Sequence, residues 1–217
     1  MKEIKGIRLQ PIIDLHSEKT FGYEVLSELS PDVDNEIWFH QQSPDRLLAL
    51  HQWQLQQLET LPLNGTLFLN LPLAALQLPG LEQQLAGENR QTVIELQDPE
   101  MLLTLSERQL SRLRQGLSAL SLAGFAVWLD DYRPCYNAVL NQLDWRFDGI
   151  KIDKHVFQQR RHSQEALIRL IGDTRKYGGK ILVEGVETAG DLFAVLQSPA
   201  DMAQGFFWPE IRIPAAA

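Results

Sequence analysis

Polar side chains stand at the ends of a series of short apolar runs in this chain. They are Glu24, Asn70, Glu95, the adjacent pair Asp130 and Asp131, Lys151, Glu184 and Gln204. If the apolar runs are parallel strands of one barrel, their carboxyl ends meet at one mouth and these side chains converge there. Several carboxylates in one place repel one another unless cations lie between them.

The types of these residues indicate which cations would bind. Carboxylate and amide oxygens favour Mg²⁺ or Mn²⁺, whereas the histidines and the single cysteine show no spacing typical of a zinc site. The neighbours Asp130 and Asp131 suit two ions that share one carboxylate, and Lys151 could hold an attacking water or a phosphate oxygen. Any one of these acids alone is more simply a helix cap or a loop residue. Together they predict a two-metal hydrolase without naming its substrate.

The elements that would position these residues follow one another regularly. Residues 6–14 and 21–29 are predicted to form a hairpin, and further strands are expected at 66–71, 92–96, 126–129, 149–152, 180–183 and 203–208. Helices are expected from Ser43-Pro44, from the capping box of Ser106 and Gln109, and over 136–143, 163–177 and 188–196. This alternation predicts the α/β class and a (β/α)8 TIM-like barrel. A doubly wound open sheet is the alternative, but no G-x-G-x-x-G follows the first strand.

Composition narrows the class of protein further. The 217 residues contain 20 Lys and Arg against 28 Asp and Glu, a net charge of −8, which argues against a DNA-binding protein. The one cysteine, Cys135, cannot form an internal disulfide and fits a reducing, cytoplasmic compartment. No apolar run is long enough to cross a membrane. We therefore expect one barrel domain over residues 1–217, in the cytoplasm and without a membrane partner.

The motifs also follow the order of a known family. The chain reads Gln-Pro-Ile from Gln10, Glu-Val-Leu from Glu24, Leu-Asn-Leu around Asn70, Ile-Glu-Leu at Glu95, Leu-Asp-Asp to Asp131, Ile-Lys-Ile-Asp at Lys151, Val-Glu-Gly-Val-Glu-Thr at Glu184 and Gln-Gly-Phe from Gln204. This series resembles the EAL-domain family, with Glu-Val-Leu in place of the signature Glu-Ala-Leu. The resemblance extends from about residue 8 to residue 209.

The resemblance implies a fold, an activity and a set of roles. EAL domains are cyclic di-GMP phosphodiesterases on a barrel whose first strand is antiparallel, and they use two Mg²⁺ or Mn²⁺ ions to open the ligand to linear pGpG. By resemblance, the metal ligands are Glu24, Asn70, Glu95, Asp130 and Asp131. The catalytic residues are Lys151, Glu184 and Glu24, and the substrate-binding residues are Gln10, Leu26, Gln204 and Arg133. The resemblance also allows a homodimer.

Two departures from the family pattern bear on activity. Glu28 stands where the family has an arginine near a ligand phosphate, and Tyr-Arg-Pro-Cys replaces Phe-Gly-Thr-Gly after Asp131. Because Pro134 biases Arg133 toward extended backbone, the loop should follow its own path. Either this path turns Asp131 and slows turnover, or Arg133 compensates for Glu28. A cyclic di-GMP receptor or protein-binding regulator without turnover, and a hydrolase of another phosphodiester, are the alternatives.

Overall fold

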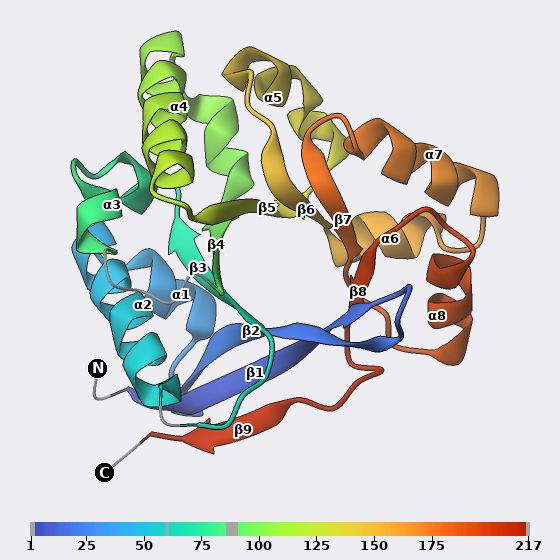
Figure 1. The fold of residues 1–217 in the computed structure, drawn as a ribbon, viewed down its shortest axis with the longest axis horizontal. Helices are drawn as coiled ribbons and strands as arrows, with labels where there is room; N and C mark the ends of the chain where they lie inside the picture. Colours follow the sequence, from blue (N-terminus) through green and yellow to red (C-terminus); the bar gives the residue numbers. More distant parts are fainter. Residues whose placement is uncertain (1–2, 60, 86–90, 216–217) are drawn as a thin grey trace.

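The computed structural model describes residues 3–59, 61–85 and 91–215, and it is drawn in Figure 1. The strands in this part of the chain are β1 (Ile4–Asp14), β2 (Lys19–Leu29), β3 (Thr66–Pro72), β4 (Thr92–Gln97), β5 (Ala126–Tyr132), β6 (Phe147–Ile152), β7 (Gly178–Val183), β8 (Met202–Gln204) and β9 (Ile211–Pro214). The α-helices are α1 (Asn35–His40), α2 (Pro44–Leu58), α3 (Leu81–Gln84), α4 (Glu107–Leu122), α5 (Asn137–Leu143), α6 (Lys154–Arg160), α7 (Gln164–Thr174) and α8 (Ala189–Leu196).

Strands β1 to β8 close into a barrel, and the helices lie outside it (Figure 1). The pairs from β2–β3 through to β7–β8 are parallel. Strand β1 is antiparallel to β2 and also to β8, so it closes the ring. The predicted barrel with an antiparallel first strand is confirmed. In addition, β9 pairs with residues 6–9 of β1, along the same edge of β1 that β8 pairs with at residues 12–14.

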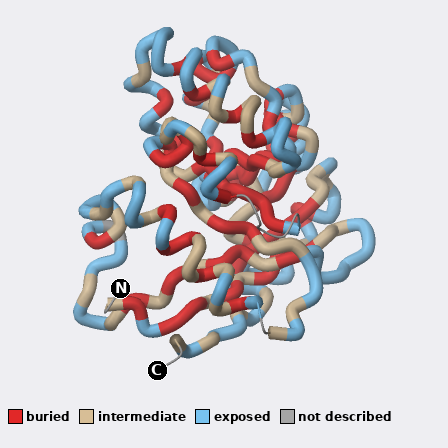
Figure 2. Tube along the Cα trace, turned by 60° about the vertical axis from the view of Figure 1, so that its left-hand side comes forward, coloured by how far each residue is buried: buried red, intermediate tan, exposed pale blue. Residues whose placement is uncertain are grey.

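The barrel interior is built in two layers, because side chains of a strand alternate between its two faces. The lower layer is an apolar cluster formed by Ile12, Phe68, Val93, Trp128, Leu182 and Met202. Two residues further toward the mouth, each of these strands carries a polar side chain that the sequence analysis singled out. Figure 2 shows the buried segments of the chain concentrated along the strands.

A larger apolar core lies between the strands and the helices. Leu110, Leu113, Leu117 and Leu120 form the buried stripe of α4, at the helical spacing that the sequence shows. The predicted helix starts are confirmed at Ser43, whose side chain caps α2, and at the capping box of Ser106. This outer core holds the strands in place from behind.

The structure corrects the sequence-based boundaries near the C-terminus. The strand predicted over 203–208 is wrong beyond Gln204, because Gly205 takes a φ of +158° and lies against the backbone of Val186. The helix predicted over 163–177 ends at Thr174. Strand β9 and helix α6 were not predicted. In the part of the chain that the structure describes, no helix has the length and apolar character needed to span a membrane.

Gly149 on β6 is the position where the lower layer has no room for a side chain. A Cβ built there would lie 2.2 Å from the Trp128 ring, and that ring packs edge-on against Phe68 with centroids 5.1 Å apart. We expect Gly149→Ala to destabilise the protein by about 1–3 kcal/mol, because an overpacked core forces its neighbours to shift. Urea unfolding followed by Trp fluorescence would measure the change.

Gly172 provides the matched control. It lies inside α7, and a Cβ there meets nothing within 4 Å. Gly172→Ala is expected to stabilise the protein by about 0.5–1 kcal/mol, because alanine loses less backbone entropy in a helix. Equal effects of the two substitutions would contradict the packing explanation.

Candidate active site

The upper layer of the barrel interior brings the predicted polar residues together. They are Gln10 on β1, Glu24 on β2, Asn70 on β3, Glu95 on β4, Asp130 on β5, Lys151 on β6, Glu184 after β7 and Gln204 on β8. Six of them lie two positions from an apolar residue of the lower layer, and the other two, Glu24 and Lys151, lie two positions beyond Gly22 and Gly149. In a parallel barrel this layer is the carboxyl-end mouth, where barrel enzymes place their sites.

Lys151 lies at the centre of this layer and is completely buried. Its Nζ atom is 2.9 Å from a carboxylate oxygen of Asp130, 3.0 Å from one of Glu184, and 3.2 Å from one each of Glu24 and Glu95. One ammonium group therefore neutralises part of a cluster of four carboxylates. A buried charge of this kind is tolerated only when it is paired, so each partner depends on the other.

Glu24 is the most fully hydrogen-bonded carboxylate of the cluster. Its Oε1 accepts a 3.1 Å hydrogen bond from Nδ2 of Asn70, and its Oε2 accepts from Lys151 and from Nε2 of Gln204. The same Nε2 of Gln204 donates to Gln10 at 2.9 Å. These bonds tie β1, β2, β3, β6 and β8 together and fix the orientation of the Glu24 carboxylate.

The protonation of the cluster follows from burial and from these contacts. Burial and the nearby carboxylates raise the pKa of Asp130 to about 6, and they raise the pKa values of Glu95 and Glu184 well above the usual range. For Glu24, burial is outweighed by Lys151 and by hydrogen bonds from Asn70 and Gln204, which lower its pKa. Burial is likewise outweighed at Lys151, since the four carboxylates raise its pKa well above that of an ordinary lysine. The ammonium form is thus retained.

Asp131 reaches the same site by a local departure from strand geometry. Adjacent residues of a regular strand face opposite sides, so Asp131 would be expected to point away from Asp130. Its φ is +46°, a left-handed conformation that aspartate tolerates better than most residues, and the β5–β6 register shifts between Leu129 and Tyr132. Carboxylate oxygens of Asp130, Asp131 and Glu184 consequently lie within 4.8 Å of one another.

The donor atoms of the site fit divalent metal ions. Glu24, Glu95 and Asp130 form a second group with oxygens within 4.8 Å of one another, so Asp130 belongs to both groups. Within the described residues, Oδ1 of Asn70 and Oε2 of Glu95 are buried acceptors without a hydrogen-bond partner. Unsatisfied buried oxygens are costly, and a cation would satisfy them. The site is therefore suited to two oxygen-coordinated ions that share Asp130.

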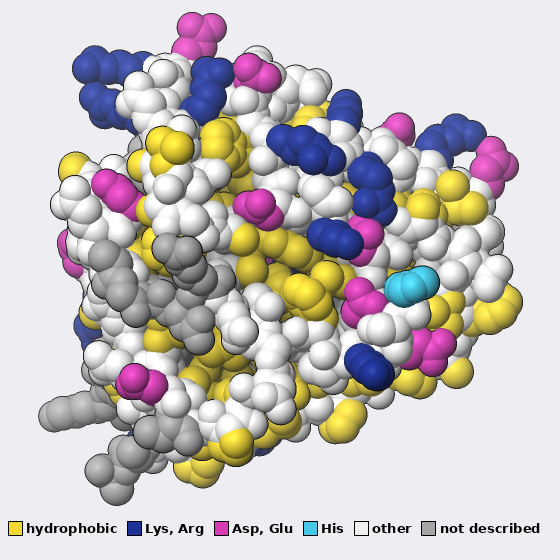
Figure 3. All heavy atoms as spheres, viewed as in Figure 1, with side chains coloured by type: hydrophobic (Ala, Val, Ile, Leu, Met, Phe, Trp, Pro, Cys, Tyr) yellow, Lys and Arg dark blue, Asp and Glu magenta, His cyan; other side chains and the backbone are white. Residues whose placement is uncertain are grey.

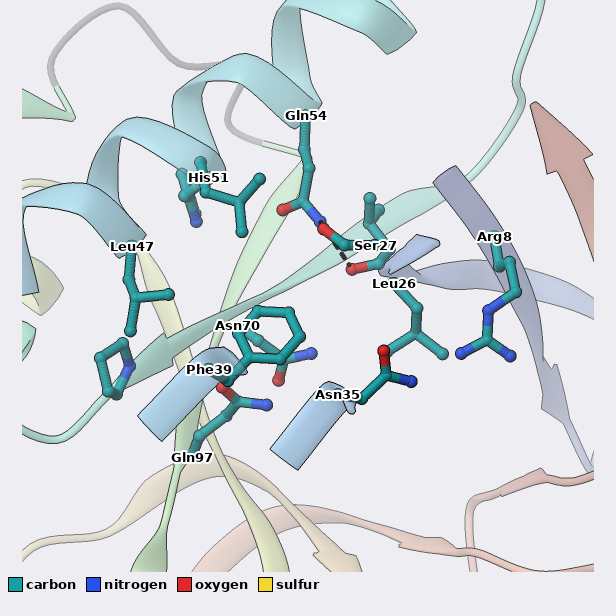
Figure 4. Close-up of a pocket in the computed structure, with 13 residues that line it drawn as sticks. Arg8, Leu26, Ser27, Asn35, Phe39, Leu47, His51, Gln54, Asn70 and Gln97 are labelled. Atoms are coloured by element: carbon teal, nitrogen blue, oxygen red, sulfur yellow. Dashed lines mark hydrogen bonds between the residues drawn. The ribbon is translucent and has the colours of Figure 1, made fainter. Parts of the chain in front are cut away.

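A cavity of about 200 Å³ opens beside this cluster (Figure 4). Asn70 lies on its wall together with Leu26, which follows Glu24 by two residues on β2, and with Phe39 and Asn35 from α1. The cavity thus joins the polar layer to a partly apolar wall.

The face of the molecule drawn in Figure 3 has apolar side chains near its centre. Basic and acidic side chains are intermixed around them.

The structure shows the partners of the two residues that depart from the family pattern. Arg133 has extended backbone, as Pro134 predicts, and its Nη2 pairs at 3.0 Å with Asp153, which caps α6. Glu28 forms an ion pair with Arg212 of β9, with 3.0 Å between Oε1 of Glu28 and Nη1 of Arg212. The negative charge at position 28 is therefore compensated within the fold.

Sequence reasoning missed Arg8 and Glu210. Arg8 lines the cavity, and its Nη1 lies 3.3 Å from both carboxylate oxygens of Glu210. The position of Arg8 could have been found, because it precedes Gln10 by two residues and so shares its face of β1. Its pairing with a residue 202 positions later could not.

Comparison with known proteins places this barrel in a family. Residues 5–210 match the family model described as the EAL domain. The chain belongs to the EAL-domain family. A comparison with curated proteins returned no match.

Solved structures of other EAL domains share the fold. The calcium and cyclic di-GMP complex of Klebsiella pneumoniae BlrP1 superposes with a TM-score of 0.77 at 20% identity, over 99% of this chain and 60% of that one. The FimX EAL domain of Pseudomonas aeruginosa bound to cyclic di-GMP gives 0.76 at 23% identity, over 96% and 91%. A standalone EAL protein of Vibrio cholerae O395 in its cyclic di-GMP-bound form gives 0.70 at 16% identity, over 96% and 92%. This EAL chain spans 60% of the BlrP1 chain.

The pKa of Asp130 predicts how metal binding depends on pH. At pH 5 this carboxyl is largely protonated and a metal ion must displace the proton, whereas at pH 8 it is ionised and free to bind. We expect excess Mn²⁺ to raise the melting temperature more at pH 8 than at pH 5. At a metal concentration of about 100 times Kd the stabilisation is about 2.7 kcal/mol, or roughly 5–11 °C for a chain of this size.

Thermal unfolding with and without Mn²⁺ at the two pH values measures this difference. Asp130→Asn serves as the control, since it lacks the titrating carboxylate and should show a small shift at both pH values. A shift that is larger at pH 5 than at pH 8 would contradict the assignment of these carboxylates as metal ligands.

Proposed function

We propose that this EAL domain binds cyclic di-GMP at the mouth of its barrel and hydrolyses it to linear pGpG with two Mg²⁺ or Mn²⁺ ions. The observation that carries the proposal is the completeness of the donor set. The carboxylates of Glu24, Glu95 and Asp130 form one ion-sized group, and those of Asp130, Asp131 and Glu184 form a second. The amide of Asn70 hydrogen-bonds Glu24 beside the first group. The complexes of FimX and BlrP1 with cyclic di-GMP support the choice of ligand.

The roles of the residues follow from their contacts. Glu24, Asn70, Glu95 and Asp130 would hold one ion, and Asp130, Asp131 and Glu184 the other. When bound, the ions would neutralise the phosphodiester and lower the pKa of the attacking water. Hydrolysis would join the water oxygen to phosphorus and break the bond from phosphorus to the 3′ oxygen. That oxygen would take up the proton that the water loses, which gives a product with a 5′-phosphate and a free 3′ hydroxyl.

Lys151 would act as a fixed cation in this reaction. Because its pKa is well above the ordinary value, it stays protonated and donates hydrogen bonds instead of accepting a proton. It can therefore hold the attacking water or a phosphate oxygen. Gln10, Leu26 and Gln204 would contact the nucleotide, since the two glutamines hydrogen-bond across the mouth and Leu26 lies on the cavity wall. Arg133 is the remaining substrate-binding candidate, and it would first have to leave Asp153.

A receptor without turnover is the second candidate, and one observation favours it. Lys151 contacts four carboxylates, so the protein itself neutralises part of the charge of the site. A chain that binds the nucleotide without ions would act as a sensor. A structure of Klebsiella pneumoniae BlrP1 with FMN and cyclic di-GMP and without metal ions supports this candidate, because the nucleotide is bound there without ions.

Product analysis separates the two candidates. The wild type is incubated with cyclic di-GMP and Mg²⁺ or Mn²⁺, and the nucleotides are separated by chromatography. We expect linear pGpG to form, and we expect excess chelator to stop it. Binding of cyclic di-GMP without product in either metal would favour the receptor instead.

Glu24→Gln tests the site itself. The substitution keeps the shape of the side chain but removes the negative charge that Lys151 and a metal ion would share, so we expect hydrolysis to fall by at least about 100-fold. Circular dichroism should show an intact fold. Glu165→Gln on the exposed side of α7 is the control and should keep wild-type turnover. Unchanged hydrolysis in Glu24→Gln would contradict the proposed active site.

A further inference from the structure

Arg8 occupies the ligand-facing side of β1. In the β1–β2 ladder Gln10 pairs with Glu24, and Arg8 pairs with Leu26 one step further out. Because side chains alternate along a strand, these four residues share one face. At about 3.3 Å per residue, Arg8 lies roughly 7 Å from the Glu24 row along the strand, directly above the polar layer.

The guanidinium of Arg8 lies at the cavity beside the polar layer. Figure 4 shows it on the opposite side of Leu26 from Asn70. Of the described residues that line this cavity, Arg8 alone is a lysine or arginine. Its side chain is 27% exposed, so it is partly desolvated and still accessible.

Glu210 holds Arg8 without using all of its donors. Both hydrogen bonds to the Glu210 carboxylate come from Nη1, at 3.3 Å each. In the part of the chain that the structure describes, Nη2 and Nε make no further hydrogen bond that would block them. A guanidinium with a free edge can bind a phosphate through two parallel hydrogen bonds.

The neighbouring arginine, Arg212, pairs with a different acidic residue. Arg212 of β9 pairs with Arg8 across the β1–β9 ladder, and its guanidinium reaches across Gly6 to Glu28 at 3.0 Å. It does not line the cavity. The two arginines therefore lie opposite each other in the β1–β9 ladder and each pairs with an acidic residue. They differ in that only Arg8 lines the cavity.

We infer that Arg8 binds the phosphodiester of cyclic di-GMP that is not cleaved. This inference rests on the proposed function. A cyclic dinucleotide has two phosphodiesters, and when one lies at the carboxylate cluster the other must lie beyond it. Among the described residues that line the cavity, Arg8 is the cation at that distance, and it offsets the negative charge that the outer phosphate would meet at Glu210.

Calorimetric titration of cyclic di-GMP in Ca²⁺ measures the contribution of Arg8. We expect Arg8→Gln to weaken binding by about 10- to 100-fold, the range for a lost hydrogen bond to a charged group. Arg212→Gln, the matched control, should change affinity by less than about threefold. In Mn²⁺, Arg8→Gln should raise KM with little change in kcat, because a contact to the uncleaved phosphate is the same before and during the reaction.

Glu210→Gln separates a ligand contact from a structural ion pair. This variant leaves Arg8 in place and removes the competing carboxylate, so its affinity should equal or exceed that of the wild type. A loss as large as that of Arg8→Gln would mean that only the ion pair matters, and would overturn the inference.

The remaining outcomes are also decisive. Wild-type affinity in Arg8→Gln, or equal losses in Arg8→Gln and Arg212→Gln, would overturn the role of Arg8 while leaving the proposed function intact. Failure of the wild type to bind cyclic di-GMP would instead refute the proposed function, and the inference would be refuted with it.

Discussion

The structure depends on one buried ammonium group surrounded by carboxylates. Lys151 is fully buried, and four acidic side chains, three from strands and one from the residue after β7, lie within 3.2 Å of its Nζ. Desolvating this many charges is strongly unfavourable, so the cluster persists only because every member has a partner. The carboxylates outnumber the lysine, and burial keeps the pKa values of three of them raised. This imbalance favours the addition of further cations.

The barrel makes this arrangement possible by separating its interior into two layers. Beneath the polar layer lie Trp128, Phe68 and their neighbours, which close the barrel to water from below. Gly149 leaves the space that Trp128 fills, two residues before Lys151 on the same strand. The same strands therefore supply both an apolar floor and the charged groups above it. The position of each charged group follows from the packing of the layer beneath.

The sequence predicts much of this site because the spacing is regular. An apolar residue followed two positions later by a polar one, as in Phe68 and Asn70 or Val93 and Glu95, places both inside a barrel. The order of the motifs then identifies the family. The sequence also predicts local structure that a single residue determines. The Ser43 side chain caps the start of α2, and Pro134 holds the preceding residue, Arg133, in extended backbone.

Other features depend on contacts between distant parts of the chain. The pairing of Arg8 with Glu210 and of Glu28 with Arg212 requires β9, which is short and mostly exposed and so lacks a periodic apolar signal. The left-handed turn at Asp131, which lets two successive carboxylates face one site, likewise has no pattern in the sequence. The end of β8 at Gln204 is set by the close approach of Gly205 to Val186, a tertiary contact that the apolar run at 203–208 conceals.

The central claim is that two metal ions supply the positive charge that the carboxylate cluster needs in addition to Lys151. Its most direct test is a crystal structure grown with Mn²⁺ and cyclic di-GMP, with manganese located by anomalous scattering. The account predicts two manganese peaks that share Asp130, one beside Glu24, Asn70 and Glu95 and the other beside Asp131 and Glu184. Nucleotide bound at the mouth with no manganese peak, and Lys151 still in contact with all four carboxylates, would contradict it.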